Sequence, residues 1–197
     1  MKVIIAGGGI GGLTAALALL RAGIDAQVFE RVKHPAPLGV GINLLPHASR
    51  ELHALGLAEA LDATAIRTRA MRYSTRRGRI AISVDCGRHA GYQWPQYSLH
   101  RGQFQMLLLD TLRERAGVDA VLTGHALADY RQDARGVDAF FDRADGSRVQ
   151  VRGDVLVGAD GLHSRTRALR WPLEGRPLYS GMTLYRGAVE TAPYLDG

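Results

Sequence analysis

The residues with the clearest chemical use are the five glycines of Gly7-Gly8-Gly9-Ile10-Gly11-Gly12. Their spacing is typical of a loop that binds the pyrophosphate of a dinucleotide. Gly7 permits a tight turn, Gly9 lets a pyrophosphate approach the backbone, and Gly12 lets the following helix lie close to the sheet. The N-terminus of that helix offers unpaired N–H groups and partial positive charge to the phosphates. The alternative is a glycine-rich turn that binds nothing.

An acidic residue stands where such a site needs one. Glu30 follows the loop by roughly 20 residues, the distance at which a carboxylate accepts hydrogen bonds from ribose hydroxyls. Its negative charge disfavours a 2′-phosphate. We therefore expect FAD or NAD, rather than NADP, as the tightly bound ligand.

The elements that position these residues form a βαβ unit. The apolar residues 3–6 predict a strand, and residues 26–30 predict a second one that ends at Glu30. Between them, residues 13–22 have apolar positions at helical spacing, and Gly23 stands where a glycine ends many helices.

Asp160 and Arg101 are further candidates, each with an alternative explanation. Asp160 follows the apolar run 155–157, which is typical of a central parallel strand covered on both faces, and precedes an expected helix over 162–169. Its carboxylate could bind ribose or phosphate-bound water at the sheet's carboxyl edge, or it could cap that helix. Arg101 opens an expected helix over 101–116 after a turn at 97–100, where a cation is locally unfavourable. It could pair with a phosphate or lie on the surface.

The remaining chemistry-bearing residues form no recognisable site. The seven histidines lack metal-ligand spacing, and no serine or cysteine stands in a nucleophile motif. We therefore expect no catalytic side chain and no metal, with the chemistry supplied by a bound cofactor. Cys86 is the only cysteine, which excludes an intrachain disulfide. No signal peptide or membrane-spanning apolar run is evident, so we expect a cytoplasmic protein without stable membrane insertion.

Charge raises the question of a nucleic-acid partner. The net charge is +6, and arginines make up 23 of the 25 basic residues. These arginines are scattered, and no nucleic-acid-binding motif accompanies them. A solvated, arginine-biased surface is the better explanation, so no nucleic-acid partner is expected.

The rest of the 197 residues alternates between short elements. Residues 31–45 suggest an irregular loop, residues 66–85 a β-hairpin, and residues 87–97 an irregular segment. Further elements are expected as helices over 46–55 and 57–62, and as strands over 118–122, 126–130, 136–143, 147–152 and 182–189.

Several motifs recur together in the order of a known family. They are the glycine loop with Glu30, residues 38–42, His100-Arg101 with Phe104 and Leu108, and residues 154–161 with His163, Ser164 and Arg167. In this combination the chain resembles the class A FAD-dependent aromatic hydroxylases, which share the para-hydroxybenzoate hydroxylase fold. Within that family it is most similar to phenazine hydroxylases. The resemblance implies an α/β fold: a Rossmann-like FAD/NAD(P)-binding βαβ domain with a β-hairpin insertion and the start of a substrate-domain sheet.

The resemblance also implies roles for individual residues. Phosphate contacts would come from the backbone of the glycine loop, and Arg101 would contact the ribityl–phosphate region. Glu30 would bind the adenosine ribose, Arg31 would lie near the adenine end, and Leu127 would contribute its backbone to the adenine pocket. The other implied FAD-contacting residues are Gly7, Gly9, Gly11, Gly12, Gly41, Ile42 and Asp160, with Gly41 and Ile42 along the isoalloxazine ring.

The implied reaction is hydroxylation of a small phenazine- or hydroxybenzoate-like aromatic compound with NADH or NADPH and O2. Residues 1–175 would form the FAD-binding domain, with 66–97 belonging partly to the substrate side, and 176–197 would begin a truncated substrate domain. Because family members are considerably longer, an exposed sheet that supports a homodimer is expected. The sequence leaves open an FAD- or NAD-linked dehydrogenase or reductase, and a non-catalytic nucleotide-binding fragment.

Overall fold

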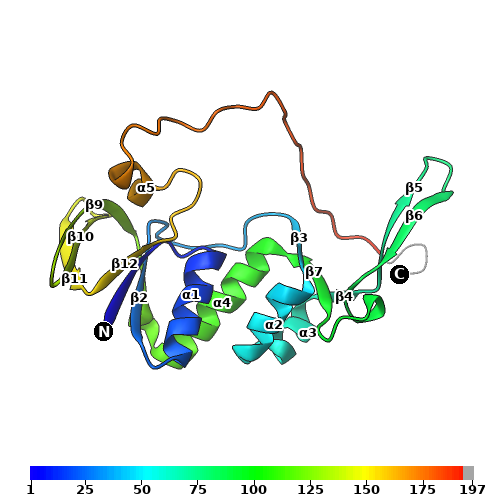
Figure 1. Cartoon of the computed structure of the whole chain (residues 1–197), viewed down its shortest axis with the longest axis horizontal. Coiled ribbons are helices and arrows are strands. Elements are labelled where there is room, and N and C mark those ends of the chain that lie inside the picture. The colour runs from blue at the N-terminus through cyan, green and yellow to red at the C-terminus, as the bar shows by residue number, and fades with distance from the viewer. Residues whose placement is uncertain (193–197) are drawn as a thin grey trace.

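The computed structural model describes residues 1–192 and is built around a four-stranded parallel sheet (Figure 1). Its strand order is β12-β1-β2-β8. The bounds are β1 Lys2–Ala6, β2 Asp25–Glu30, β8 Val121–Thr123 and β12 Val155–Gly158. Strand β1 is apolar on both faces because both are covered: Ile5 faces one core cluster and Ile4 faces another.

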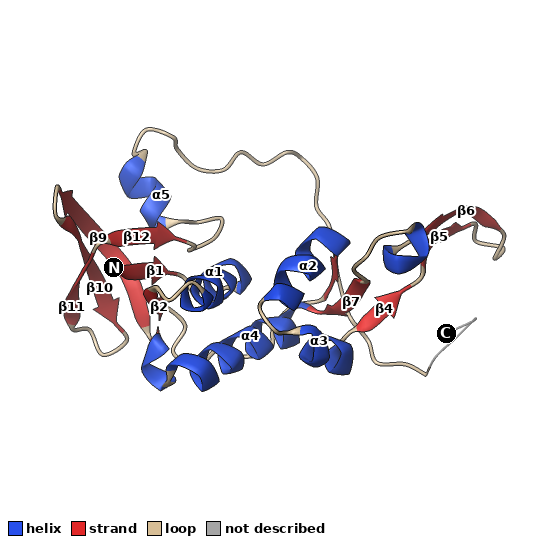
Figure 2. Cartoon of the chain, turned by 60° about the horizontal axis from the view of Figure 1, so that its bottom comes forward, coloured by secondary structure: helices blue, strands red, loops and turns tan. Residues whose placement is uncertain are grey.

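Two helices cover one face of this sheet (Figure 2): α1, Ile10–Arg21, and α4, Arg101–Ala116. Leu13 of α1 and Leu108 of α4 are fully buried in the core that they share with the sheet. Helix α1 ends at Arg21, with Ala22 as its C-cap, and the φ of +71° at the following Gly23 lets the N–H of Ile24 reach the carbonyl of Leu19 at 2.9 Å. Both helices confirm the expectations from the apolar spacing.

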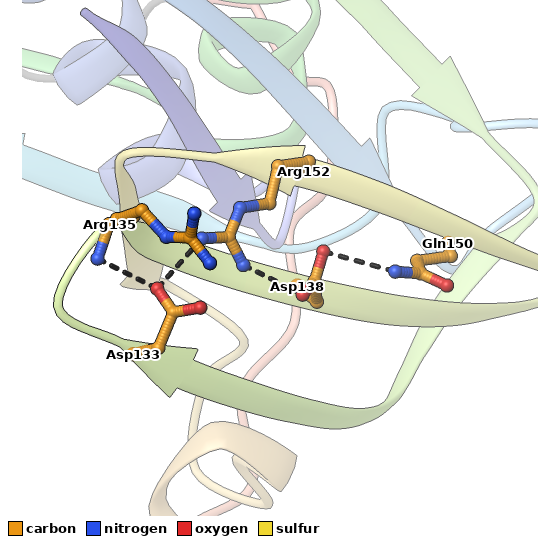
Figure 3. Close-up of polar contacts among 5 residues, drawn as sticks. All are labelled: Asp133, Arg135, Asp138, Gln150 and Arg152. Atoms are coloured by element: carbon orange, nitrogen blue, oxygen red, sulfur yellow. Dashed lines mark hydrogen bonds and ion pairs between the residues drawn. The ribbon is translucent and has the colours of Figure 1, made fainter.

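A three-stranded antiparallel sheet covers the other face. It consists of β9 His125–Asp133, β10 Gly136–Arg143 and β11 Arg148–Gly153. Its inner face packs Phe141 against Phe29, with ring centroids 4.2 Å apart. On its outer face Arg152 bridges Asp133 and Asp138 at 2.8 and 2.7 Å (Figure 3). Because these charges are exposed, packing of the inner face dominates the stability of this layer.

A smaller sheet with order β3-β7-β4 lies at the N-terminal end of α4, which directly follows β7. Its strands are β3 Gly41–Leu44, β7 Gln96–His100 and β4 Ile66–Thr68, and α2 Pro46–Ala54 and α3 Ala58–Thr64 lie beside it. The expected loop over 31–45 was wrong for 41–44, as was the expected turn over 97–100. Strands β3 and β7 are short, and each is set by pairing with the other across the sequence, which local pattern does not reveal.

A buried hydroxyl fixes β7 to the two neighbouring helices. The hydroxyl of Tyr97 donates to Asp62 at 2.8 Å and lies 3.1 Å from Nε2 of His53. Arg67 also donates to Asp62, at 2.7 Å. Burial raises the pKa of Tyr97 and lowers the pKa of His53, so both stay neutral at pH 7 and the network survives there. These hydrogen bonds fix the position of β7. Because Arg101 directly follows β7, its backbone position is fixed as well.

A two-stranded hairpin projects beyond this small sheet (Figure 1). It comprises β5 Ala70–Ser74 and β6 Ile80–Asp85, and it confirms the hairpin expected within 66–85, although residues 66–68 pair with β7 instead. The short 3-10 helices η1 Gly87–Ala90 and η2 Val118–Ala120 complete the elements before β8.

The last described part of the chain departs from the sequence-based expectation. Strand β12 pairs only with β1 within residues 1–192 and is therefore an edge strand, with Val155 42% exposed, rather than a central one. After α5, Arg165–Arg170, residues 171–192 contain no strand, so the strand expected over 182–189 was wrong (Figure 2). Apolar alternation forms a strand only when another strand supplies hydrogen bonds. Within residues 1–192, no helix has the length and apolar character needed to cross a bilayer.

Candidate functional site

A cavity of about 490 Å³ opens at the carboxyl ends of β1, β2 and β12, beside the start of α4. This is where open α/β sheets bind their ligands. The predicted site residues that line it are Gly7, Gly9, Glu30, Arg31, Arg101, Leu127 and Asp160. The tertiary structure thus brings together residues from five separate segments.

The glycine loop combines two kinds of glycine. A Cβ on Gly12 would overlap the carbonyl oxygen of Gly7, and a Cβ on Gly7 would overlap the carbonyl of Ala159, so these two positions are required for packing. A Cβ on Gly9 or Gly11 would meet nothing within 4 Å. These two glycines instead leave the approach to the helix N-terminus open. Within residues 1–192, the N–H groups at positions 10–12 find no acceptor.

Glu30 braces the loop from the end of β2. Its Oε2 accepts from the N–H of Gly8 at 2.6 Å, and its Oε1 accepts from the N–H of Val32 at 2.8 Å. Each carboxylate oxygen keeps a second lone pair. Glu30 can therefore hold the loop and still accept a hydrogen bond from a ribose hydroxyl.

Arg101 places a free cation at the cavity. Its N–H donates to the carbonyl of Val40 at 2.9 Å, but its guanidinium has no hydrogen bond or ion pair to any part of residues 1–192. The neighbouring His100 caps α4, with Nδ1 accepting from Gln103 at 3.3 Å and Nε2 donating to Gly39 at 2.9 Å. The capped helix directs an unneutralised charge at the cavity, which favours an anionic ligand.

Asp160 has a structural partner of its own. Its Oδ1 accepts from the hydroxyl of Ser164 at 2.5 Å and its Oδ2 accepts from the N–H of Thr166 at 2.9 Å. Burial raises the pKa of Asp160, but these hydrogen bonds to the charged form outweigh burial and hold it below its ordinary value. Asp160 thus supports the start of α5 and also lines the cavity. The N-cap of α5 is Ser164 rather than Asp160, and binding of ribose or of phosphate-bound water by Asp160 stays a prediction.

Replacing Asp160 by asparagine should cost about 1 kcal/mol of unfolding free energy at pH 7, because the amide nitrogen cannot accept the hydrogen bond that a carboxylate oxygen accepts. The pKa of folded Asp160 is lowered, so its contribution is full above the ordinary aspartate pKa and is lost as the pH falls through the lower folded value. Urea unfolding across this acid range should show the difference from wild type shrinking. The exposed Asp110→Asn is the control, and an equal loss in both variants would contradict the assignment.

Not all predicted residues lie at this cavity. Gly11 and Gly12 lie in the first turn of α1 behind it. Gly41 and Ile42 lie on β3, opposite His100 and Leu99 of β7, and do not line it. Gly41 and Ile42 are linked to the cavity indirectly: their strand β3 pairs with β7, and Arg101, which directly follows β7, lines the cavity.

Sequence analysis missed four polar side chains at the cavity: Gln105, His125, His163 and Arg165. Gln105 donates from Nε2 to the carbonyl of Gly8 at 2.9 Å. His125 lies 2.8 Å from the carbonyl of Thr123, and Arg165 donates to a β9 carbonyl at 2.9 Å. Gln105 lies one helical turn after Arg101, and that spacing is the signal that could have identified it.

These features fit FAD. The open glycines and free amides suit a pyrophosphate, Arg101 supplies an unpaired cation, and Glu30 supplies an acceptor near a ribose. Residues 1–178 match the family described as the FAD binding domain. The chain belongs to this family.

Individual relatives agree with this result. The chain is 44% identical to the phenazine 1,6-dicarboxylic acid hydroxylase of Lysobacter antibioticus over 99% of its own length and 49% of that protein. It is 40% identical to the 3-amino-4-hydroxybenzoate 2-monooxygenase of Streptomyces platensis, over 95% of this chain and 46% of that one. The chain therefore spans about half the length of the curated relatives that it matches.

Solved structures share the fold. Klebsiella pneumoniae HpxO complexed with FAD and uric acid aligns with a TM-score of 0.70 and 32% identity, covering 85% of this chain and 41% of that one. The flavin-dependent monooxygenase PieE in complex with FAD and substrate aligns with a TM-score of 0.74 and 27% identity, over 86% and 32% of the two chains. The relatives are FAD-dependent aromatic hydroxylases, and the family is enzymatic.

Proposed function

We propose that this chain is the FAD-binding part of a monooxygenase that hydroxylates a small aromatic substrate with NADH or NADPH and O2. The observation that carries the proposal is the convergence of an open glycine loop and the unpaired Arg101 on one cavity. Its relatives' names point to a phenazine- or hydroxybenzoate-like substrate. Residues 1–175 would form the FAD-binding domain, with 66–97 partly on the substrate side, and 176–197 would begin the substrate domain.

The chain's own residues would bind and orient the cofactor. Bound FAD would supply the redox chemistry that no side chain here supplies. The amides after Gly9 would hold the pyrophosphate, with Arg101 neutralising its charge, and Glu30 would accept from the ribose. Arg31 and Leu127 would lie at the adenine end. Gly41 and Ile42 would lie at the flavin end, along the edge strand β3.

Titration with FAD tests this assignment, followed by flavin fluorescence and the visible spectrum. Saturable binding is expected, and Arg101→Ala should weaken it about tenfold through loss of a charge-assisted contact. Arg21→Ala, at the exposed last turn of α1, is the matched control and should bind as wild type does. A folded chain that binds no FAD would contradict the proposal.

Oxygen consumption distinguishes the proposed reaction from its alternatives. A monooxygenase consumes O2 in step with hydroxylated product when given NADH or NADPH and a phenazine or hydroxybenzoate acid. An FAD- or NAD-linked dehydrogenase or reductase would oxidise the nicotinamide without hydroxylating the acid. A non-catalytic nucleotide-binding fragment would bind FAD and do neither. We propose a cytoplasmic location in line with the single Cys86, to be tested by cell fractionation.

We also propose that the hairpin β5–β6 mediates a homodimer. Met71 pairs with Val84 and Tyr73 with Ile82, so these four side chains share one face of the hairpin. All four are 45–56% exposed within residues 1–192, on a ribbon that projects from the body (Figure 1). Two such faces packed together would bury them.

Replacing Ile82 by lysine should weaken this dimer about 100-fold, since each copy loses one apolar side chain of roughly 1.5 kcal/mol. Sedimentation equilibrium measures the effect. Ser83→Lys, on the opposite face of the same strand, is the control and should leave the dimer intact. A wild-type chain that stays monomeric would contradict this part of the proposal.

A further inference from the structure

Gly8 is held by side chains from two different elements. It is buried, and its N–H donates to Glu30 at the end of β2 at 2.6 Å. Its carbonyl accepts from Nε2 of Gln105 on α4 at 2.9 Å. Both hydrogen-bonding groups of this glycine are therefore satisfied by side chains rather than by backbone ladders.

The geometry points to Gln105 as a positioning residue for the phosphate loop. This inference rests on the proposed FAD site and adds to it a residue that orients the phosphate-binding loop. We infer that Glu30, through the N–H of Gly8, and Gln105, through its carbonyl, fix the two peptide groups on either side of Gly8, and thereby aim the free amides of residues 10–12 at the bound phosphate.

The placement of Gln105 explains why this contact would matter to a phosphate. Gln105 lies one turn beyond Arg101 on the same helix, and both line the cavity. Helix α4 therefore contributes a cation for the phosphate and an amide that orients the loop. Arg101 and Gln105 belong to one rigid helix, so the guanidinium of Arg101 stays near the loop that Gln105 holds. This fixed arrangement reduces the entropic cost of ordering the site when a phosphate binds.

Hydrogen-bond chemistry predicts what substitutions at this position do. Leucine fills similar space but donates nothing, so the buried carbonyl of Gly8 loses its partner and the peptide is free to rotate. Lysine keeps a donor of similar reach. Gln103, exposed on the same helix and without a side-chain hydrogen bond in residues 1–192, offers a matched control of the same residue type.

The test uses the full chain and ADP, which carries a pyrophosphate without a flavin. Calorimetric titration below the unfolding temperature should show Gln105→Leu raising the Kd for ADP about tenfold. Gln105→Lys should stay within about threefold of wild type, and Gln103→Leu should be unchanged. A residue that only stabilises the fold would lower the melting temperature without changing this Kd, so an unchanged Kd in Gln105→Leu overturns the inference.

Hydrogen exchange of the free chain separates this inference from the proposed function. If wild type binds neither ADP nor FAD, the proposed function fails, but the clamp still makes a prediction. The amide of Gly8, which donates to Glu30, should exchange faster in Gln105→Leu than in Gln103→Leu, because the loop loses one of its two anchors. Equal exchange in the two variants overturns the inference.

Discussion

Replacing Gly12 by alanine is expected to destabilise the folded protein strongly. The added Cβ would overlap the carbonyl oxygen of Gly7, a backbone atom that cannot move aside as a flexible side chain can, and Gly12 itself is buried. Relief requires α1 to move away from β1, which would open the core around Leu13. We expect a loss of about 3 kcal/mol or more, a large share of the stability of a domain of this size. Urea unfolding followed by circular dichroism measures it.

Gly11→Ala is the matched control in the same helical turn. No atom lies within 4 Å of the Cβ that it would add. Alanine in a helix is favoured over glycine by roughly 0.5–1 kcal/mol, so the chain without ligand should be as stable as wild type or slightly more so. Equal destabilisation by the two substitutions would show that α1 and β1 are not in the close contact described above.

Replacing Gly9 by glutamate is expected to abolish FAD binding while the protein remains folded. Gly9 has an extended backbone at φ −76°, which any residue adopts, and its Cβ would meet nothing within 4 Å. A carboxylate at the N-terminus of α1 interacts favourably with the helix dipole, so stability should be unchanged or slightly raised. The same carboxylate occupies the approach of the pyrophosphate and repels it, at a cost of about 3 kcal/mol, or more than 100-fold in Kd.

Fluorescence titration with FAD measures the loss, and thermal unfolding without ligand shows that the fold survives. Gly9→Ala is the intermediate variant: its methyl group narrows the approach without adding charge, so its loss should be smaller. If Gly9→Glu binds FAD as tightly as wild type does, the glycine loop is not the phosphate site. Loss of binding together with unfolding would instead mean that this position is packed, contrary to its open surroundings.

The βαβ unit could be predicted from local pattern because each signal lies within a few residues. The apolar run before Gly7, the helical spacing after Gly12 and the position of Gly23 fix strand, loop, helix and helix end. The hairpin at 70–85 and the strands over 136–143 and 148–153 were likewise recognisable from alternation and a turn at Gly146. In these elements local preference and tertiary structure agree.

Short strands with distant partners were not predictable in this way. Strand β3 exists because β7 pairs with it, and β12 lies at an edge because only β1 lies beside it within residues 1–192. Residues 182–189 have the alternation of a strand but no neighbour to pair with in that part of the chain. A strand depends on its partner's hydrogen bonds, so its own residues are insufficient evidence.

The sequence by itself determined the dinucleotide loop, the acid at Glu30 and the helix that begins at Arg101, since residue type and spacing carry those signals. Only the tertiary structure decided that Gln105 holds Gly8, that Asp160 accepts hydrogen bonds at the start of α5 while lining the cavity, and that Gly41 and Ile42 lie outside the cavity. These facts depend on which segments meet at the sheet's carboxyl edge. That meeting is set by the packing of α4 and the β9–β11 sheet on opposite faces of one sheet, not by any local run of residues.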